Sequence, residues 1–187
     1  GVLVRFFHAA FTKIAQDTGA MPDTIETIFW RYNDKVCSGE MTVDEFNKIV
    51  AKQLGVKHFD WQHYYLSSID PIEAVHDAVV WTAEHYEVGL MSNIMPGFIG
   101  QLLHKKLIPD VPYSAIVDSS LVHAVKPQAK VYEIAQRMAG VKSNEILLID
   151  DSRANLTAAD KFEWHVLWFD DFKPDDSVAR IRSALEF

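Results

Sequence analysis

Apolar residues recur at intervals of three and four along the first part of the chain, which predicts helices there. The positions that carry this spacing in the first two helices are Phe7, Ala10, Phe11, Ile14, Ile25, Ile28, Phe29, Tyr32 and Val36. Thr42 and Glu45 form a capping box that predicts the start of a third helix. A short helix over 60–67 and a helix that opens with Pro71 are expected to follow. No strand is expected in the first seventy or so residues.

From Glu87 onward, short apolar runs alternate with helical segments. The predicted strands are 88–91, 115–118, 145–150 and 165–169, and the predicted helices are 97–107, 127–139, 152–161 and 177–185. These strands are apolar throughout, as strands are when helices cover both faces of a parallel sheet. The second part of the chain is therefore predicted to be an α/β domain with a parallel sheet.

Composition supports a folded protein and narrows its partners. The chain has 187 residues, 49% of them hydrophobic, which suits one domain or one domain with a small insertion. Its 18 basic and 26 acidic residues give a formal charge of −8, which disfavours binding to nucleic acid or to an anionic membrane. A single cysteine, Cys37, excludes an intrachain disulfide, and no apolar run is long enough to span a bilayer. We therefore expect a soluble protein of the cytoplasm.

Polar residues follow three of the predicted strands, and the ends of parallel strands meet at one edge of a sheet, where ligands bind. Ser92 and Asn93 follow the first strand, just before a predicted helix. A hydroxyl and a backbone turn at a helix start can hold a phosphate by hydrogen bonds. The alternative is that Ser92 only begins the helix.

Lys126 precedes Pro127, which keeps the lysine extended immediately before a helix. The ammonium is thereby placed near the N-terminus of the helix, and the positive charge of each would attract an anion. The alternative is a lysine that is simply solvated.

Asp150 and Asp151 are adjacent at the end of a strongly apolar run. Two neighbouring carboxylates repel each other, and a cation or a hydrogen-bond donor must offset this repulsion. A hard divalent ion that prefers oxygen ligands would do so, and Mg²⁺ is the leading candidate. The alternative is structural: Asp150 would cap the strand, and Asp151 would cap the next helix through Asn155.

Other candidate residues carry less chemistry. The spacing of His58 and His63 does not put two metal ligands on one helical face. Cys37 falls in a predicted loop over 37–41, between the second and third helices, with no base beside it. Because Gly39 allows this loop to turn, we expect the loop to approach the active site.

Taken in order, these segments resemble the later motifs of the haloacid dehalogenase-like hydrolases: a strand ending in Ser, a Lys before Pro, and a strand ending in two acids. The run 1–4, Gly-Val-Leu-Val, is similar to the end of that family's opening motif, D-x-[DG]-G-V-L. The resemblance implies a Rossmann-like parallel sheet with helices on both faces, plus a small all-helical cap. It divides the chain into the end of the first strand (1–4), the cap (5–70) and the α/β core (71–187).

The resemblance also implies a mechanism. Ser92 and Asn93 would orient the phosphoryl group, Lys126 would neutralise charge, and Asp150 and Asp151 would hold Mg²⁺. An aspartate nucleophile is expected a few residues before Gly1, in a segment that would form the central strand of the sheet. An enzyme of this kind would hydrolyse a small phosphorylated metabolite through an aspartyl-phosphate intermediate.

Two other functions stay open at this stage. Family members that displace halide from 2-haloacids need no metal, and their last motif resembles Ser-Ser-Asn, whereas this chain has paired acids in 149–152. A non-catalytic member would keep the fold as a binding or regulatory module. For a phosphatase, we expect substrate choice to depend on the loop 37–41, with Trp30 and Glu40 contributing to KM.

Overall fold

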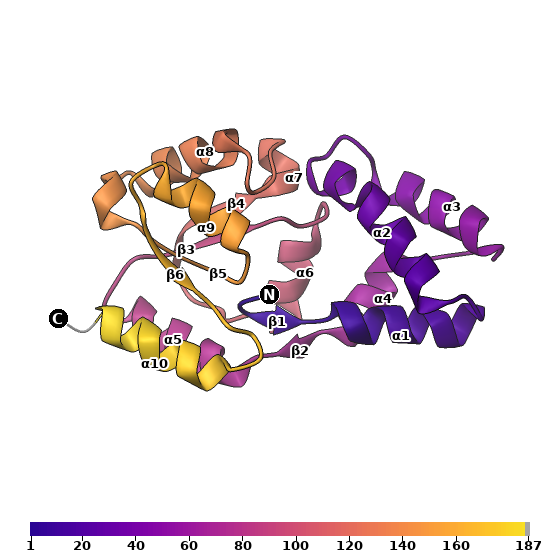
Figure 1. Cartoon of the computed structure of the whole chain (residues 1–187), viewed down its shortest axis with the longest axis horizontal. Helices are drawn as coiled ribbons and strands as arrows, with labels where there is room; N and C mark the ends of the chain where they lie inside the picture. Colours follow the sequence, from indigo (N-terminus) through magenta and orange to yellow (C-terminus); the bar gives the residue numbers. More distant parts are fainter. Residues whose placement is uncertain (186–187) are drawn as a thin grey trace.

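The computed structural model describes residues 1–185, which form a helical lobe beside an α/β lobe (Figure 1). The helical lobe consists of α1 (Phe7–Thr18), α2 (Pro22–Cys37), α3 (Val43–Leu54) and α4 (Trp61–Ser68). The predicted capping box is confirmed, since Thr42 Oγ1 accepts from Glu45 N at 3.1 Å and Glu45 Oε2 accepts from Thr42 N at 2.9 Å. No helix in the described part of the chain is long and apolar enough to cross a membrane.

A two-stranded antiparallel ribbon joins the lobes. Strands β1 (Val4–Arg5) and β2 (Asp70–Pro71) pair residue by residue, and Ile72 N donates to Leu3 O at 3.0 Å. The prediction of no strand in this part of the chain is therefore wrong, as is the helix start at Pro71. The two connections between the lobes run side by side and satisfy each other's backbone groups, and a two-residue pairing leaves no periodic pattern in the sequence.

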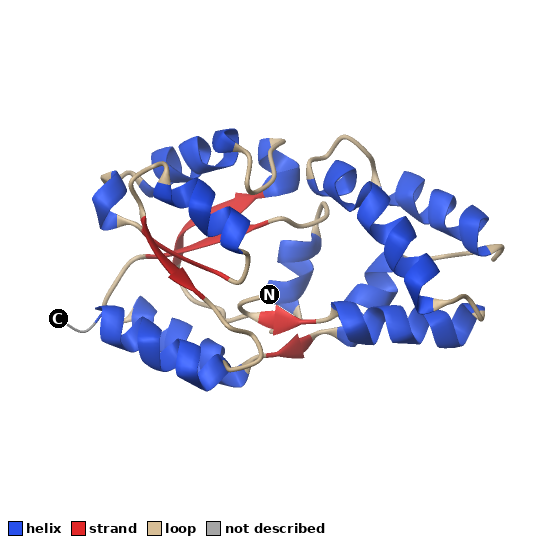
Figure 2. Ribbon diagram, in the orientation of Figure 1, coloured by secondary structure: helices blue, strands red, loops and turns tan. Residues whose placement is uncertain are grey.

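The α/β lobe contains the predicted alternation of strands and helices (Figure 2). Its elements are α5 (Glu73–Ala83), β3 (Val88–Ser92), α6 (Phe98–His104), β4 (Tyr113–Asp118), α7 (Ser119–Val122), α8 (Ala129–Ala139), the 3₁₀ turn η1 (Ser143–Glu145), β5 (Leu147–Asp150), α9 (Arg153–Asp160), β6 (His165–Trp168) and α10 (Pro174–Leu185). The four predicted strands are confirmed. The sequence pattern missed α7, which is too short for a period, and began α10 three residues late. Residues 186–187 of the predicted core lie outside the described residues.

The sheet consists of two parallel pairs, β3 with β4 and β5 with β6. In residues 1–185 no backbone ladder joins β3 to β5. Apolar side chains of α8 and α9 cluster with Val117 and Leu148, whereas those of α5 and α10 cluster with Ile149 and Leu167. Helices thus cover both faces of parallel strands, and the predicted α/β class is confirmed.

The two lobes share one apolar cluster. The Tyr65 ring of α4 lies 4.9 Å from the Phe98 ring of α6 and 4.5 Å from Phe6, and all three belong to a cluster that extends through α1, α2 and α3. The helical lobe is therefore packed against α6 as well as being connected through the ribbon of β1 and β2.

Candidate active site

Lys126 and Asp150 form a buried ion pair where β3 and β5 end. Lys126 Nζ lies 2.7 Å from Asp150 Oδ2, and the side chains are only 11% and 3% exposed. The same ammonium donates to Met91 O at 3.1 Å. The lysine thus connects the carboxyl ends of two strands that share no ladder in the described residues.

Asp150 uses its second oxygen to begin α9. Asp150 Oδ1 accepts from Ser152 N at 2.8 Å and from Asn155 Nδ2 at 3.0 Å. Asn155 therefore contacts Asp150, and not Asp151 as the structural alternative required. Asn155 is in turn fixed by Tyr132, whose hydroxyl donates to Asn155 O at 2.8 Å. Both Asp150 oxygens are consequently engaged by donors of the protein.

Asp151 faces outward, towards the start of the described chain. Its side chain is 40% exposed, and its Oδ2 lies 3.1 Å from the backbone nitrogen of Gly1. Its carbonyl accepts from Trp168 Nε1 at 3.0 Å, which fixes the loop that follows β5.

Asn93 holds the backbone of Lys126 by two hydrogen bonds. Asn93 Nδ2 donates to Lys126 O at 2.8 Å, and Lys126 N donates to Asn93 Oδ1 at 2.7 Å. A side-chain amide that pairs with both backbone groups of one residue fixes that residue's position, because each bond restricts the other. The position of the ammonium therefore depends on Asn93.

Ser92 ends β3 and lies in register with Asp118 of β4. Asp118 is buried, and its Oδ1 accepts from Ser120 N at 2.9 Å and Ser120 Oγ at 2.6 Å. Among the described residues no protein group is hydrogen-bonded to the Ser92 hydroxyl. The structure thus brings five candidate residues, the strand-end residues, to one edge of the sheet. Ser92 and Asn93 lie at the end of β3, and Asp150 and Asp151 lie at the end of β5. Lys126 lies in the loop between α7 and α8, and its ammonium reaches Met91 O and Asp150.

The donors at this edge fit a hard cation by chemical type. Carboxylate oxygens are preferred ligands of Mg²⁺, and the exposed Asp151 carboxylate is accessible, whereas Asp150 is already bonded on both oxygens. Within residues 1–185 no group of three or more histidine, cysteine or acidic side chains is positioned to enclose a metal. A complete magnesium site therefore needs ligands besides these two acids.

Cys37 is a buried structural residue. It is the last residue of α2 rather than a loop residue, so the predicted loop position is wrong, and its side chain is 2% exposed. Burial first, and then the nearby carboxylates of Asp34 and Asp118, together raise the pKa of the Cys37 thiol to about 12. A thiol that stays protonated in this way is not a nucleophile at neutral pH.

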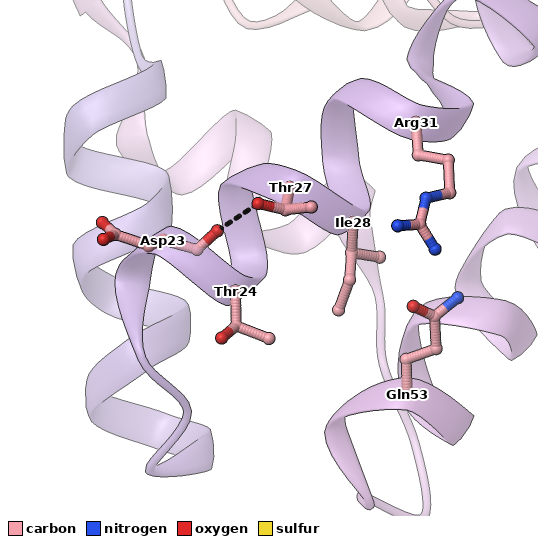
Figure 3. Close-up of a pocket in the computed structure, with 6 residues that line it drawn as sticks. All are labelled: Asp23, Thr24, Thr27, Ile28, Arg31 and Gln53. Atoms are coloured by element: carbon pink, nitrogen blue, oxygen red, sulfur yellow. Dashed lines mark hydrogen bonds between the residues drawn. The ribbon is translucent and has the colours of Figure 1, made fainter.

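An open hollow on the helical lobe lies apart from these residues. It is lined by Asp23, Thr24, Thr27, Ile28, Arg31 and Gln53, and Figure 3 shows Arg31 of α2 facing Gln53 of α3. Trp30 lies on the same helix; its Nε1 donates to Glu26 Oε1 at 3.1 Å, and its ring lies 4.9 Å from the Phe7 ring at a tilt of 45°. None of these residues is bonded to a strand-end residue, so the hollow is separate from the candidate active site.

The model of one family, haloacid dehalogenase-like hydrolase, matches residues 9–169, which include every candidate strand-end residue. The chain belongs to this family. The comparison with curated proteins gave no match.

Solved structures share the fold of this haloacid dehalogenase-like chain at low identity. A predicted HAD-like family hydrolase from Porphyromonas gingivalis has a TM-score of 0.79 and 17% identity, covering 100% of this chain and 93% of its own. A HAD family enzyme from Bacteroides thetaiotaomicron, in complex with magnesium and inorganic phosphate, has a TM-score of 0.69 and 19% identity over 91% and 90%. An L-2-haloacid dehalogenase from Xanthobacter autotrophicus, with chloropropionic acid covalently bound, has a TM-score of 0.67 and 15% identity over 98% and 79%.

Proposed function

We propose that this protein is a Mg²⁺-dependent phosphatase that hydrolyses small phosphate monoesters. The observation that carries the proposal is the buried Lys126–Asp150 ion pair, with the exposed Asp151 carboxylate next to it at the edge of the sheet. Phosphoryl transfer depends mainly on positioning and on stabilising negative charge. A fixed ammonium and a carboxylate that suits a divalent ion supply both kinds of group.

The nucleophile in this proposal is an aspartate that precedes Gly1. The run 1–4, Gly-Val-Leu-Val, supports its placement there, since it is similar to the end of the family motif that carries this aspartate. In addition, β3 and β5 share no ladder in the described residues. The aspartate carboxylate would attack phosphorus, the ester P–O bond would break, and the leaving oxygen would take a proton from solvent water. Water would then hydrolyse the aspartyl-phosphate.

Each strand-end residue has a role in this reaction. Magnesium, when bound by Asp151 and by ligands from the preceding segment, would neutralise phosphate charge. The Lys126 ammonium would face the same anion from the other side, and the Ser92 hydroxyl would donate to a phosphoryl oxygen. Asn93 already pairs with the backbone of Lys126, so it would act chiefly by holding that lysine. The helical lobe would act as the cap over the substrate's leaving group, in an enzyme of the cytoplasm.

A 2-haloacid dehalogenase is the second candidate, since the fold is shared with one that carries a covalent chloropropionic acid. The paired acids favour the phosphatase, because the exposed Asp151 carboxylate is available to a divalent ion, whereas the last motif of the metal-independent dehalogenases resembles Ser-Ser-Asn.

The two candidates differ in product and in metal requirement. The assay uses the protein that includes the residues before Gly1, with p-nitrophenyl phosphate and with 2-chloropropionate, each with Mg²⁺ and with chelator. We expect phosphate release that needs Mg²⁺ and falls at least a hundredfold in Asp151→Asn, whereas Asp160→Asn, an exposed acid at the end of α9, retains it. Chloride release without Mg²⁺, and no phosphate release, would establish the dehalogenase instead.

A further inference from the structure

Ser119, the first residue of α7, connects three segments from the interior of the molecule. It is fully buried, and its Oγ accepts from Ile94 N at 2.9 Å. Its proton is shared between Cys37 O at 2.6 Å and Ile94 O at 3.2 Å. Its backbone carbonyl accepts from Ala124 N at 3.2 Å. One side chain therefore bonds both the end of α2 and the loop that follows β3.

The loop that follows α2 in the helical lobe lies next to α7 (Figure 1). His123 Nδ1 lies 3.0 Å from Ser38 O, and Gly39 has a φ of +74°. A Cβ atom at Gly39 would lie 2.8 Å from Ser120 O and 2.9 Å from His123 Nδ1. The loop after α2 therefore fits against α7 only because residue 39 has no side chain.

The two segments of the α/β lobe that are hydrogen-bonded to Ser119, at Ile94 and at Ala124, also contain residues of the candidate active site. Ile94 directly follows Asn93, and Ala124 lies two residues before Lys126. Asn93 and Lys126 are themselves joined by two hydrogen bonds, and Lys126 reaches Asp150. A displacement of the lobe at Cys37 would thus act, through Ser119, on the two segments that position the ammonium.

We propose that Ser119 is a positioning residue that couples the seating of the helical lobe on α7 to the placement of Asn93 and Lys126. The catalytic consequence rests on the proposed phosphatase function; the coupling itself does not. Contacts between the helical lobe and a substrate would then change the positions of Asn93 and Lys126, although no residue of the lobe touches the phosphate.

Two variants with matched controls test the coupling. Ser119→Ala removes the hydrogen bonds of the Ser119 hydroxyl. Ser177→Ala is its control, because Ser177 is equally buried and its Oγ likewise accepts from a backbone amide, Asp170 N at 2.9 Å, and donates to a backbone carbonyl, Asp170 O at 3.2 Å. Ser177 Oγ accepts in addition from Arg180 Nη2 at 3.1 Å. Gly39→Ala disturbs the contact from the side of the lobe. Its control is Gly55→Ala, since Gly55 has a φ of +70° but a Cβ atom there would meet no other atom within 4 Å, so both substitutions carry the left-handed strain.

In the protein that includes the residues before Gly1, we expect kcat for p-nitrophenyl phosphate to fall about tenfold or more in Ser119→Ala and Gly39→Ala, with KM changed less than about threefold. The controls should keep kcat within about twofold. The double variant should be no slower than the slower single variant, because both act through one contact. Unchanged kcat in Gly39→Ala, or fully additive losses in the double variant, would overturn the proposal.

Amide hydrogen exchange provides a readout that does not need activity. We expect faster exchange at Ile94 and Ala124 in Gly39→Ala than in the unmodified protein, and no change there in Gly55→Ala. If the unmodified protein has no phosphatase activity but Gly39→Ala accelerates these amides, the proposed function fails and the coupling stands. Unchanged exchange at both amides in Gly39→Ala would refute the coupling whatever the activity.

Discussion

Among the single residues of the site, Lys126 has the central place, because its ammonium forms an ion pair with the buried Asp150 carboxylate. Lys126 Nζ and Asp150 Oδ2 are 24 positions apart in sequence and 2.7 Å apart in space. The sequence predicted both residues, because each follows a recognisable pattern at a strand end or helix start. It did not predict Asn155 or Met91 O as their partners, since hydrogen bonds between distant segments leave no local pattern.

Lys126→Met should impair both chemistry and folding. It leaves the Asp150 carboxylate buried without its cation, which costs about 3–5 kcal/mol of unfolding free energy, and it lowers kcat on every phosphate ester by at least about a hundredfold. Kinetics and urea denaturation measure the two effects. Lys161→Met, at an exposed lysine after α9, is the control and should change neither. An active Lys126→Met protein would show that the ammonium does not take part in the reaction.

Cys37 gives a prediction on pH. Its thiol has a pKa of about 12 when folded, whereas an unfolded cysteine ionises near its ordinary value, close to 9. Above that ordinary value the unfolded state loses a proton that the folded state keeps, so stability falls with rising pH, by up to about 1.4 kcal/mol per pH unit. Denaturation at pH 8 and pH 10 should show a smaller decline in Cys37→Ala than in the unmodified protein. Equal declines would mean that the folded thiol ionises normally.

At the scale of elements, predictions succeeded where a segment was long enough to show its period. The strands β3, β4, β5 and β6 were predicted from apolar runs, and the capping box placed α3 to the residue. The pairing of β1 with β2, and the four-residue α7, were missed because both segments are too short to show a period. The element that carries Ser119 was thus beyond what periodicity can show.

The capping box at α3 provides a test that separates stability from chemistry. Thr42→Ala removes the oxygen that accepts from Glu45 N and should lower the free energy of unfolding by about 1 kcal/mol. The loss should be smaller at low pH, because hydrogen bonds from the Thr42 backbone and hydroxyl lower the pKa of Glu45 and so stabilise its ionised form. Thermal and urea denaturation measure it, and kcat should be unchanged. A large fall in kcat would place α3 in the active site.

In the whole molecule, the helical lobe contacts the α/β lobe at several places, among them the ribbon of β1 and β2, the packing of Tyr65 on Phe98, and the hydrogen bonds at Ser119. Because an apolar cluster crosses the boundary, we expect both lobes to unfold in a single transition. Phe98→Ala should cost about 3–5 kcal/mol and lower the stability of both lobes together. Two separated transitions in the unmodified protein would show that the lobes are thermodynamically independent.

In the proposed reaction, a phosphoryl group is transferred to an aspartate beside Lys126 and Asp151. Mass spectrometry of the acid-quenched protein can detect this aspartyl-phosphate. The protein that includes the residues before Gly1 is mixed with p-nitrophenyl phosphate and Mg²⁺, quenched during turnover, digested and mapped. The account predicts one phosphoryl group on an aspartate in the peptide that precedes Gly1, absent when Mg²⁺ is chelated and greatly reduced in Lys126→Met. Turnover with the phosphoryl group on any other residue, or turnover with no phosphorylated peptide, would contradict it.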